Sequence, residues 1–461
     1  MKFPFLLTDF YKLNHAEQYP QGTTEIYSNF TPRSVKYFPI GDQIVVFGTK
    51  YLIEEYIKNG WENNFLAKEW GYIESVVRSH INNSISGIDD FLLRLKSLHD
   101  LGYLPIKIKA LPENSIVNEK TPILTIRNTH KDFYWLTNFM ETAISSFLWK
   151  PCTTATIAKY LHDLAYKYAH RTGDTDFVPY QFHDFSLRGL SGESDAILSG
   201  IGHLTKFKGT DNVLASHVYG ELYGDNKSSS VYATEHSVMC AGGKDSEFHT
   251  YKRLINDVYP SGILSIVSDT WNYWKVLTEI LPKLKNDILK RDGKIVIRPD
   301  SGEAIKIICG DAHSHNEYEK QGSLNLLWKY FGGTINDKGY KELNEKIGLI
   351  YGDSITFDTA QSIFKRMEEM GFATTNIVLG VGSFTYEYLT RDTLGFAMKA
   401  TSCVINGCRK SLFKDPITDS GLKKSHKGLL CVKKSNGKYR VVEECNPIQE
   451  DGGELQVIYE N

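Results

Sequence analysis

The segment ILSIVSDT, residues 263–270, is a short apolar run that ends in a polar tip at Asp269. Three later segments repeat this design: KIVIRPDSGE (294–303), IGLIYGDS (347–354) and NIVLGVGS (376–383). Apolar residues at helical spacing follow the first and the third of the four segments. Continuous apolar runs separated by helices are typical of buried parallel strands, so the pattern predicts an α/β barrel or a doubly wound sheet.

The tips of these four segments carry residues that could bind a ligand. In a barrel and in a doubly wound sheet alike, the ligand lies where the carboxyl ends of the strands meet. We therefore expect the tips to converge, and they carry Asp269, Arg298, Asp300, Asp353 and Gly382. An arginine can grip a pyrophosphate through two parallel hydrogen bonds, whereas an Arg–Asp pair at the surface contributes little. Glycines let backbone amides approach a phosphate, although any single glycine can equally make a tight turn.

Length, charge and cysteine usage limit the class of protein. The 461 residues are enough for two substantial cores, and 53 basic against 55 acidic residues give a formal net charge of −2. This balance gives no global attraction to nucleic acid, and no long apolar run predicts a membrane helix. The first residues turn polar at Thr8 and Asp9, too early for a secretory signal. Seven scattered cysteines without a CxxC motif suit reduced thiols, so we expect a cytoplasmic protein with no nucleic-acid or membrane partner.

Two histidine-containing patterns could carry chemistry. Glu235 and His236 follow a short apolar segment, and a histidine beside carboxylates can act as a general base, contact an anion or accept a phosphoryl group. The alternative is a structural histidine. His313 and His315 form an HxH pattern, but the residues around them are polar, which predicts a loop and argues against a zinc site.

Ten short motifs occur in order along the chain. They are TDFYKLNHAEQYP, FHDFSLRG, FKGTDNV, ATEHS, SIVSDT, IRPDSG, YGDS, GVGS, LTRD and FKDP. Each motif is weak by itself, but the ordered set closely resembles the nicotinamide phosphoribosyltransferase family. The resemblance runs from residue 8 to about residue 428, which is nearly the whole chain.

The resemblance implies an α/β fold of the type II phosphoribosyltransferases. In that fold an irregular, barrel-like α/β domain, residues 151–385, is joined to a mixed, mainly β domain built from residues 1–150 and 386–461. It also implies a homodimer with active sites at the subunit interface. The reaction implied is transfer of the 5-phosphoribosyl group from phosphoribosyl pyrophosphate to nicotinamide, which gives nicotinamide mononucleotide and pyrophosphate.

Four residues match those that bind the base in this family. Phe185 matches the aromatic that stacks on one face of nicotinamide, and Tyr11 matches the aromatic that the other subunit supplies to the opposite face. Asp9 lies beside Tyr11 in the same motif. Asp211 matches the residue that selects nicotinamide, because its carboxylate can accept a hydrogen bond from the carboxamide and would repel the carboxylate of nicotinate.

The remaining matches concern the phosphates and the ribose. Arg188, His236 and Arg298 match pyrophosphate contacts, and Asp300 matches a ribose-side contact. The matches for the ribose and the 5′-phosphate are Gly352, Asp353, Gly382, Ser383 and Arg391. Lysines near family lysines that are associated with the phosphates are Lys399, Lys414 and Lys423 or Lys424.

The resemblance further implies Mg²⁺ as a cofactor and ATP as a coupled substrate. Asp269 and Asp300 would reach Mg²⁺ through water, with no direct protein ligand. His236 matches a histidine that ATP phosphorylates in this family, and Glu235 and Asp269 could orient its ring. Arg188, Arg298 and Mg²⁺ would stabilise the charge of the departing pyrophosphate.

Three alternatives stay open at this stage. A nicotinate phosphoribosyltransferase would turn over nicotinate, and Asp211 would have no role in it. A catalytically silent scaffold of the same fold would bind phosphoribosyl pyrophosphate without turnover. A generic sugar-phosphate barrel enzyme would not need the paired motifs TDFYK and HDFSLRG.

Overall fold

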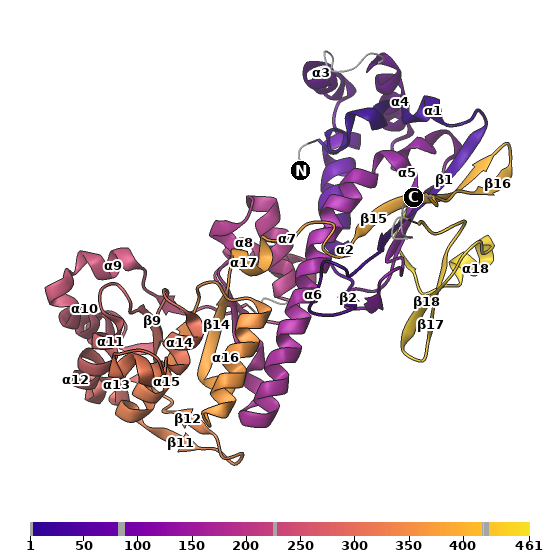
Figure 1. Cartoon of the computed structure of the whole chain (residues 1–461). Helices are drawn as coiled ribbons and strands as arrows, with labels where there is room; N and C mark the ends of the chain where they lie inside the picture. The colour runs from indigo at the N-terminus through magenta and orange to yellow at the C-terminus, as the bar shows by residue number, and fades with distance from the viewer. Residues whose placement is uncertain (1–2, 82–87, 225–227, 417, 419–423) are drawn as a thin grey trace. The chain divides into compact units, whose positions relative to one another are not determined.

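The computed structural model describes residues 3–81, 88–224, 228–416, 418 and 424–461 (Figure 1). The chain divides into two compact units. Unit 1 combines Met1–Thr156 with Leu389–Asn461, and unit 2 is the continuous stretch Ile157–Tyr388. No helix among the described residues is long and apolar enough to cross a membrane.

Unit 2 is built on a sheet of seven strands in the order β7-β6-β14-β13-β10-β9-β8, and every neighbouring pair is parallel. The strands are β6 (Phe182–Asp184), β7 (Gly209–Thr210), β8 (Tyr232–Ala233), β9 (Ser261–Val267), β10 (Asp292–Arg298), β13 (Ile347–Tyr351) and β14 (Ile377–Val381). The four segments that the sequence predicted as strands are β9, β10, β13 and β14. Together with the mainly antiparallel unit 1, this arrangement confirms the predicted fold class.

Helices connect the strands of unit 2, as parallel pairing requires. They are α7 (Glu193–His203), α8 (Val213–Tyr223), α9 (His236–Ala241), α10 (Glu247–Arg253), α11 (Tyr273–Lys275), α12 (Leu281–Lys283), α13 (Lys285–Lys290), α14 (Ala304–Cys309), α15 (Glu317–Phe331) and α16 (Phe357–Glu369). Helix α17 (Ser383–Tyr386) follows the last strand of this sheet, β14. Helix α16 shows why these segments fold as they do. The Thr356 side chain caps its first turn, the apolar face with Ile363 and Met367 is buried, and Gly371, with φ of 73°, follows its end. A small hairpin of β11 (Gly333–Ile335) and β12 (Lys341–Leu343) completes the unit.

Unit 1 contains an antiparallel sheet in the order β16-β15-β1-β5-β3-β19, a two-stranded sheet of β2 and β4, and a hairpin of β17 and β18. Its strands are β1 (Thr23–Pro32), β2 (Gln43–Val45), β3 (Ile106–Ala110), β4 (Ile116–Asn118), β5 (Leu124–Asn128), β15 (Phe396–Ile405), β16 (Cys408–Ser411), β17 (Cys431–Ser435), β18 (Lys438–Val442) and β19 (Gln456–Glu460). Its helices include α1 (His15–Gln18), α2 (Thr49–Tyr51), α3 (Trp70–Ile81), α4 (Ile88–Leu101), α5 (Trp135–Phe139) and α18 (Pro447–Asp451). The two chain ends therefore share one sheet.

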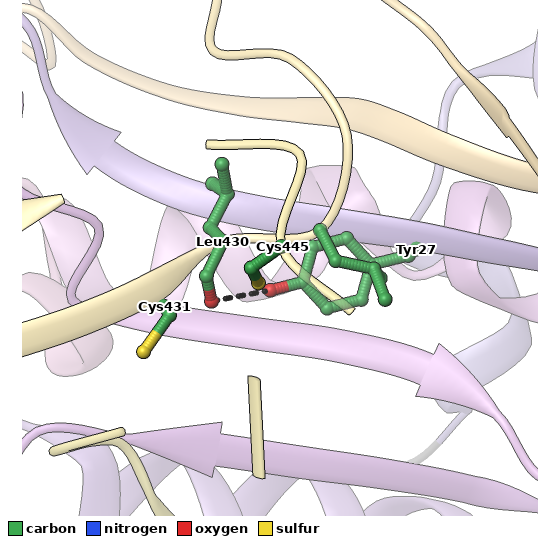
Figure 2. Close-up of a cluster of buried hydrophobic side chains, with 5 residues drawn as sticks. Tyr27, Leu430, Cys431 and Cys445 are labelled. Atoms are coloured by element: carbon green, nitrogen blue, oxygen red, sulfur yellow. Dashed lines mark hydrogen bonds between the residues drawn. The ribbon is translucent and has the colours of Figure 1, made fainter. Parts of the chain in front are cut away.

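A small buried cluster ties the C-terminal segment to strand β1. Tyr27 lies against Leu430, Cys431 and Cys445, and its hydroxyl donates to the Leu430 carbonyl oxygen at 3.5 Å (Figure 2). Burial raises the pKa of Tyr27 far above its ordinary value, so its hydroxyl stays protonated. The side chains of β1 and of the C-terminal segment thus form one core.

Two segments show where local sequence sets the ends of an element. Within residues 43–53, β2 ends at Val45, and Gly48, with φ of 93°, turns the chain into α2 and a helical segment Leu52–Leu66. Helix α6 spans Glu141–Thr172. The buried face of α6 already begins before Pro151, because Ala143, Ile144 and Leu148 are buried.

A buried ion pair fixes helix α18 to strand β3 inside unit 1. Lys109 Nζ donates to the carboxylate Oε1 of Glu450 at 3.0 Å and to its carbonyl oxygen at 2.9 Å. Only 3% and 1% of the two side chains are exposed. Removing one partner would leave the other charge buried without compensation.

We expect Lys109→Met to lower the free energy of unfolding by about 3–5 kcal/mol, since Glu450 would stay buried and unpaired. The measurement is urea unfolding followed by circular dichroism. Lys58→Met is the control, because Lys58 pairs with Glu54 at the surface and its loss should cost about 0.5 kcal/mol or less. Equal effects of the two substitutions would show that the buried pair does not hold the C-terminal helix.

Candidate active site

The carboxyl ends of the parallel strands in unit 2 bring the predicted tips together. A cavity of about 540 Å³ lies along the sheet, within the size range of small-molecule sites, and reaches the carboxyl ends of β6, β7 and β10. Its lining includes Phe185 after β6, Asp211 after β7 and Arg298 at the end of β10, with His183 and Ser230 beside them. The rest of its lining includes residues farther back along the strands, such as Ile263, Ile347 and Ile377. Strand register explains the meeting, since Arg298 pairs with Val267 and Val381 pairs with Asp184.

The ring of Phe185 packs closely against two glycines, Gly352 and Gly380. Its backbone N–H donates to the carbonyl oxygen of Val381 at 2.8 Å, which holds the residue beside β14. A Cβ at Gly380 would lie 2.4 Å from ring atom Cδ2 of Phe185, and a Cβ at Gly352 would lie 3.2 Å from the same atom. Only glycine at position 380 leaves room for the ring. The glycines of the YGDS and GVGS motifs thus serve the aromatic side chain as well as the backbone.

Asp211 is held by two donors on one carboxylate oxygen. His183 Nε2 lies 2.9 Å from its Oδ1, and the Ser230 hydroxyl donates to the same Oδ1 at 2.6 Å. Partial burial acts to raise the pKa of Asp211, but the hydrogen bonds from His183 and Ser230 and the charge of Arg298 outweigh it, so the pKa is lowered. The carboxylate therefore carries its negative charge at neutral pH.

The two predicted arginines are differently placed. The Nη2 of Arg298 donates to the carbonyl oxygen of Thr234 at 2.8 Å, which fixes the guanidinium at the end of β10. Its Nε is buried, and no protein acceptor for it occurs among the described residues. Arg188 lies in the exposed turn Leu187–Gly189 that follows Phe185. Both guanidinium groups therefore keep N–H groups that can donate hydrogen bonds to an anionic ligand.

His236 begins helix α9 and pairs with Asp269, which follows β9. The His236 Nε2 lies 3.1 Å from Asp269 Oδ1, with 49% of the histidine side chain and 8% of the aspartate side chain exposed. The other oxygen, Oδ2, accepts from the Asp300 N–H at 3.1 Å and from the Ser301 hydroxyl at 2.5 Å. Burial acts to raise the pKa of Asp269, but these hydrogen bonds outweigh it and lower the pKa. Asp269 is thus an ionised anchor between His236 and the Asp300 loop.

Three carboxylates gather around the tips of β9, β10 and β13. Burial, followed by the negative charges of Asp353, Asp300 and Asp269, raises the pKa of Tyr351. Asp300 Oδ1 lies 3.4 Å from the position of a Cβ on Gly352. This acidic group stands beside the arginines, so the site offers both signs of charge to a sugar phosphate.

The Gly382–Ser383 tip follows β14 and begins the short helix α17. A Cβ on Gly189 would clash with the Ser383 hydroxyl, so the turn that carries Arg188 packs directly on this tip. In unit 2 the structure therefore brings together Phe185, Arg188, Asp211, His236, Asp269, Arg298, Asp300, Gly352, Asp353, Gly382 and Ser383 around one edge of the sheet.

The other predicted site residues belong to unit 1. Tyr11 is 61% exposed, and its ring contacts His15 at a centroid distance of 5.2 Å. Asp9 accepts a hydrogen bond from the Thr142 hydroxyl at 2.6 Å. Arg391 lies in an exposed turn, where its guanidinium is 3.4 Å from Asp392.

Of the lysines, Lys399 and Lys424 border a small basic cavity of unit 1 that also contains Arg33. Lys414 lies in the extended segment that follows β16, and its N–H donates to Ser425. Lys423 lies outside the described residues. The HxH residues His313 and His315 lie in the loop between α14 and α15, as predicted.

Sequence reasoning missed three cavity residues. His183 and Ser230 contact Asp211, and the buried hydroxyl of Ser265 lines the cavity with no partner among the described residues. A signal existed for His183, because in a strand residues 183 and 185 point to the same face. No comparable signal marked Ser230, since its position depends on how the segment before β8 returns to β7.

Comparisons with known proteins show the family of the chain. Residues 180–446 match the nicotinate phosphoribosyltransferase family model, and residues 4–108 match the model described as nicotinamide phosphoribosyltransferase, N-terminal domain. A nicotinamide phosphoribosyltransferase of Acinetobacter baylyi is 47% identical over 99% of this chain and 94% of its own length. The chain belongs to the nicotinamide phosphoribosyltransferase family. A family member from Mycoplasma genitalium is 36% identical over 92% of this chain and 94% of its own.

Solved structures support the fold of this family member. The nicotinate-nucleotide pyrophosphorylase of Pyrococcus furiosus superposes with a TM-score of 0.56 at 14% identity and covers 99% of this chain and 89% of its own. The human nicotinic acid phosphoribosyltransferase superposes with a TM-score of 0.51 at 13% identity and covers 98% and 88%. At these identities the likeness concerns the fold alone.

The close packing of the Phe185 ring against Gly380 gives a testable prediction. We expect Gly380→Ala to displace the ring and to weaken the binding of nicotinamide about tenfold, the scale of a core overpacking cost. Calorimetric titration with nicotinamide measures the change. Gly71→Ala is the control, because a Cβ at Gly71 meets nothing within 4 Å. Unchanged affinity in Gly380→Ala would contradict a role of the Phe185 ring in base binding.

Proposed function

We propose that this chain transfers the 5-phosphoribosyl group of phosphoribosyl pyrophosphate to nicotinamide, forming nicotinamide mononucleotide and pyrophosphate. The observation that carries this proposal is the ionised carboxylate of Asp211 in the cavity beside Phe185. An anionic acceptor suits the neutral carboxamide of nicotinamide and opposes the carboxylate of nicotinate. The long, closely matched relatives named nicotinamide phosphoribosyltransferase support the same substrate.

In the proposed complex, Phe185 stacks on the pyridine ring and Asp211 accepts a hydrogen bond from the carboxamide nitrogen. Stacking orients the ring with little loss of conformational freedom. The pyridine nitrogen then attacks C1 of the ribose while the bond from C1 to the pyrophosphate oxygen breaks, and the pyrophosphate leaves with the bonding electrons. The neutral pyridine nitrogen already has a free electron pair, so this step needs no general base.

In the proposed reaction, arginines at the ends of the strands stabilise the leaving pyrophosphate. Arg298, held by Thr234 and with its Nε unpaired, and the exposed Arg188 are the proposed donors to the pyrophosphate. Charge-assisted hydrogen bonds of this kind grow stronger as negative charge develops on the departing oxygen. Asp300 and Asp353 would accept from the ribose hydroxyls, and Gly382 with Ser383 would bind the 5′-phosphate.

Mg²⁺ fits this site through water. Both oxygens of Asp269 already accept hydrogen bonds from His236, Asp300 and Ser301, which suits an outer-sphere contact better than direct coordination. No cluster of three metal-binding side chains occurs within the described residues. Asp300 and Asp269 would therefore hold the hydrated ion, which would offset the charge on the pyrophosphate.

ATP coupling through His236 is a further part of the proposal. Asp269 accepts from Nε2 of His236, which leaves Nδ1 as the nitrogen available to a phosphoryl group. In that step Nδ1 bonds to the γ-phosphorus of ATP and ADP leaves. The ionised Asp269 would balance the positive charge that the imidazole develops.

Tyr11 supports a proposed homodimer. It is 61% exposed, and its neighbour Phe10 is 55% exposed. Exposed aromatic side chains of this kind commonly mark an interface. We propose that Tyr11 and Asp9 of a second copy complete the base pocket, and that the enzyme works in the cytoplasm, which suits its free thiols.

The proposed function predicts that the enzyme uses nicotinamide in preference to nicotinate. We expect mass spectrometry to detect mononucleotide from nicotinamide, with little from nicotinate at equal concentration, in the presence of phosphoribosyl pyrophosphate and Mg²⁺. Asp211→Ala should lower kcat/KM for nicotinamide by about 10- to 100-fold, because a charge-assisted hydrogen bond is lost. A product formed mainly from nicotinate would identify a nicotinate phosphoribosyltransferase. Binding of phosphoribosyl pyrophosphate without turnover of either base would identify a silent scaffold.

The second prediction concerns the phosphohistidine. Incubation with ATP should add one phosphoryl group to the protein, detected as an acid-labile mass increase, and His236→Asn should abolish it. Asp269→Asn should slow the labelling about tenfold or more, since the imidazole would lose its ionised partner. His249→Asn is the control, because His249 is an exposed histidine on α10. Labelling that persists in His236→Asn would place the acceptor elsewhere.

A further inference from the structure

The carboxylate of Asp211 is held asymmetrically. The two hydrogen bonds to it, from His183 and from Ser230, both end on Oδ1. Within the part of the chain that the structure describes, no side chain or backbone donor reaches Oδ2. The carboxylate is fixed by one oxygen, and the other oxygen keeps its lone pairs for a ligand.

The protonation pattern of this group follows from the ionised state of Asp211. An ionised carboxylate only accepts hydrogen bonds, so the hydrogen shared with His183 must be on Nε2. Two hydrogens therefore point at Oδ1, one from the imidazole and one from the Ser230 hydroxyl. Both bonds favour the charged form of Asp211 and limit its rotation.

His183 also contacts the residue that is proposed to stack on the base. Its ring centroid lies 4.7 Å from that of Phe185, at an interplanar angle of 38°. The His183 side chain is 10% exposed, and it fits only because position 209 is glycine: a Cβ there would lie 2.8 Å from Nδ1. The parallel pairing of His183 with Gly209 sets this approach. The His183 side chain thus contacts both Phe185, which is proposed to stack on the base, and Asp211, which is proposed to bind the carboxamide.

We propose that His183 and Ser230 are positioning residues that set the selectivity for the base by holding Asp211 with Oδ2 directed to the carboxamide. This inference rests on the proposed role of Asp211 in selecting nicotinamide. Neither residue needs to touch the reacting atoms. Without the two donors Asp211 could rotate, and its charge would be less strongly favoured, so discrimination against nicotinate would weaken.

His183→Phe tests the first donor, because it keeps an aromatic ring beside Phe185 and removes the N–H. We expect KM for nicotinamide to rise about tenfold, the loss typical of one charge-assisted hydrogen bond, while kcat at saturation changes less than about twofold. The ratio of kcat/KM for nicotinamide to that for nicotinate should fall by a similar factor. His183→Gln, whose amide can donate to Oδ1, should recover most of the loss.

Ser230→Ala tests the second donor without disturbing the core, since Ser230 is exposed. It should lower the same ratio in the same direction, by about threefold, because the Ser230 bond is exposed and water can partly replace it. Its exposed position keeps the proposal testable even where His183→Phe does not fold. The proposal is overturned if the ratio is unchanged in both Ser230→Ala and His183→Phe. It is also overturned if the ratio is unchanged in Ser230→Ala and His183→Gln does not recover the loss seen in His183→Phe.

A double-mutant cycle separates this inference from the proposed role of Asp211. If His183 acts through Asp211, His183→Phe should change the ratio little in an Asp211→Ala background, whereas additive effects would overturn the inference. Asp211→Ala alone reports on the proposed function: if it leaves the ratio unchanged, the assigned role of Asp211 is wrong. If it changes the ratio and His183→Phe does not, only the positioning role fails.

Discussion

Parallel pairing between neighbouring strands is the constraint on which the site in unit 2 depends. Because β9, β10, β13 and β14 all run the same way, each contributes its following residues to the same edge of the sheet. A parallel register leaves little freedom: once Arg298 pairs with Val267, Asp269 must lie near Asp300. The helices between the strands serve this alignment, since they return the chain to the opposite edge each time. Side chains separated by more than a hundred residues thereby become neighbours.

The chemistry of the site follows from how its charges are separated. Negative charge is concentrated on Asp211 and on the group around Asp269, and burial alone would raise the pKa of both Asp211 and Asp269. Local donors prevent this: His183 and Ser230 for Asp211, and the Asp300 loop with His236 for Asp269. The pKa of each acid is therefore lowered because neighbouring residues donate hydrogen bonds to it. The same bonds hold the acids in place, so charge and orientation have one cause.

The sequence carried much of this arrangement, and the parts that it lacked have a physical explanation. The strands β9, β10, β13 and β14 are long enough to give apolar runs, and their tips were predicted to meet. The strands β6, β7 and β8 contain only two or three residues each and leave no such pattern. The alternation of side chains could place His183 on the same face as Phe185. Its contact with Asp211 depends on the pairing of β6 with β7, which leaves no pattern in the sequence. The role of Gly380 beneath Phe185 was hidden similarly, because a glycine in a strand does not show which ring it accommodates.

The shared sheet of the two chain ends has a consequence for the order of events on the ribosome. Strand β1 (Thr23–Pro32) pairs with β15 (Phe396–Ile405), and β3 pairs with β19 (Gln456–Glu460), the last strand of the chain. Every strand of the parallel sheet, in contrast, has been synthesised by Val381. Unit 2 can therefore complete its sheet during translation. Strands β1 and β3 can pair with β5 early, but the other edge of each waits for β15 or β19. The part of the chain that is made first is thus the part that finishes folding last, and through that interval it depends on other means to keep its unpaired strand edges from aggregating.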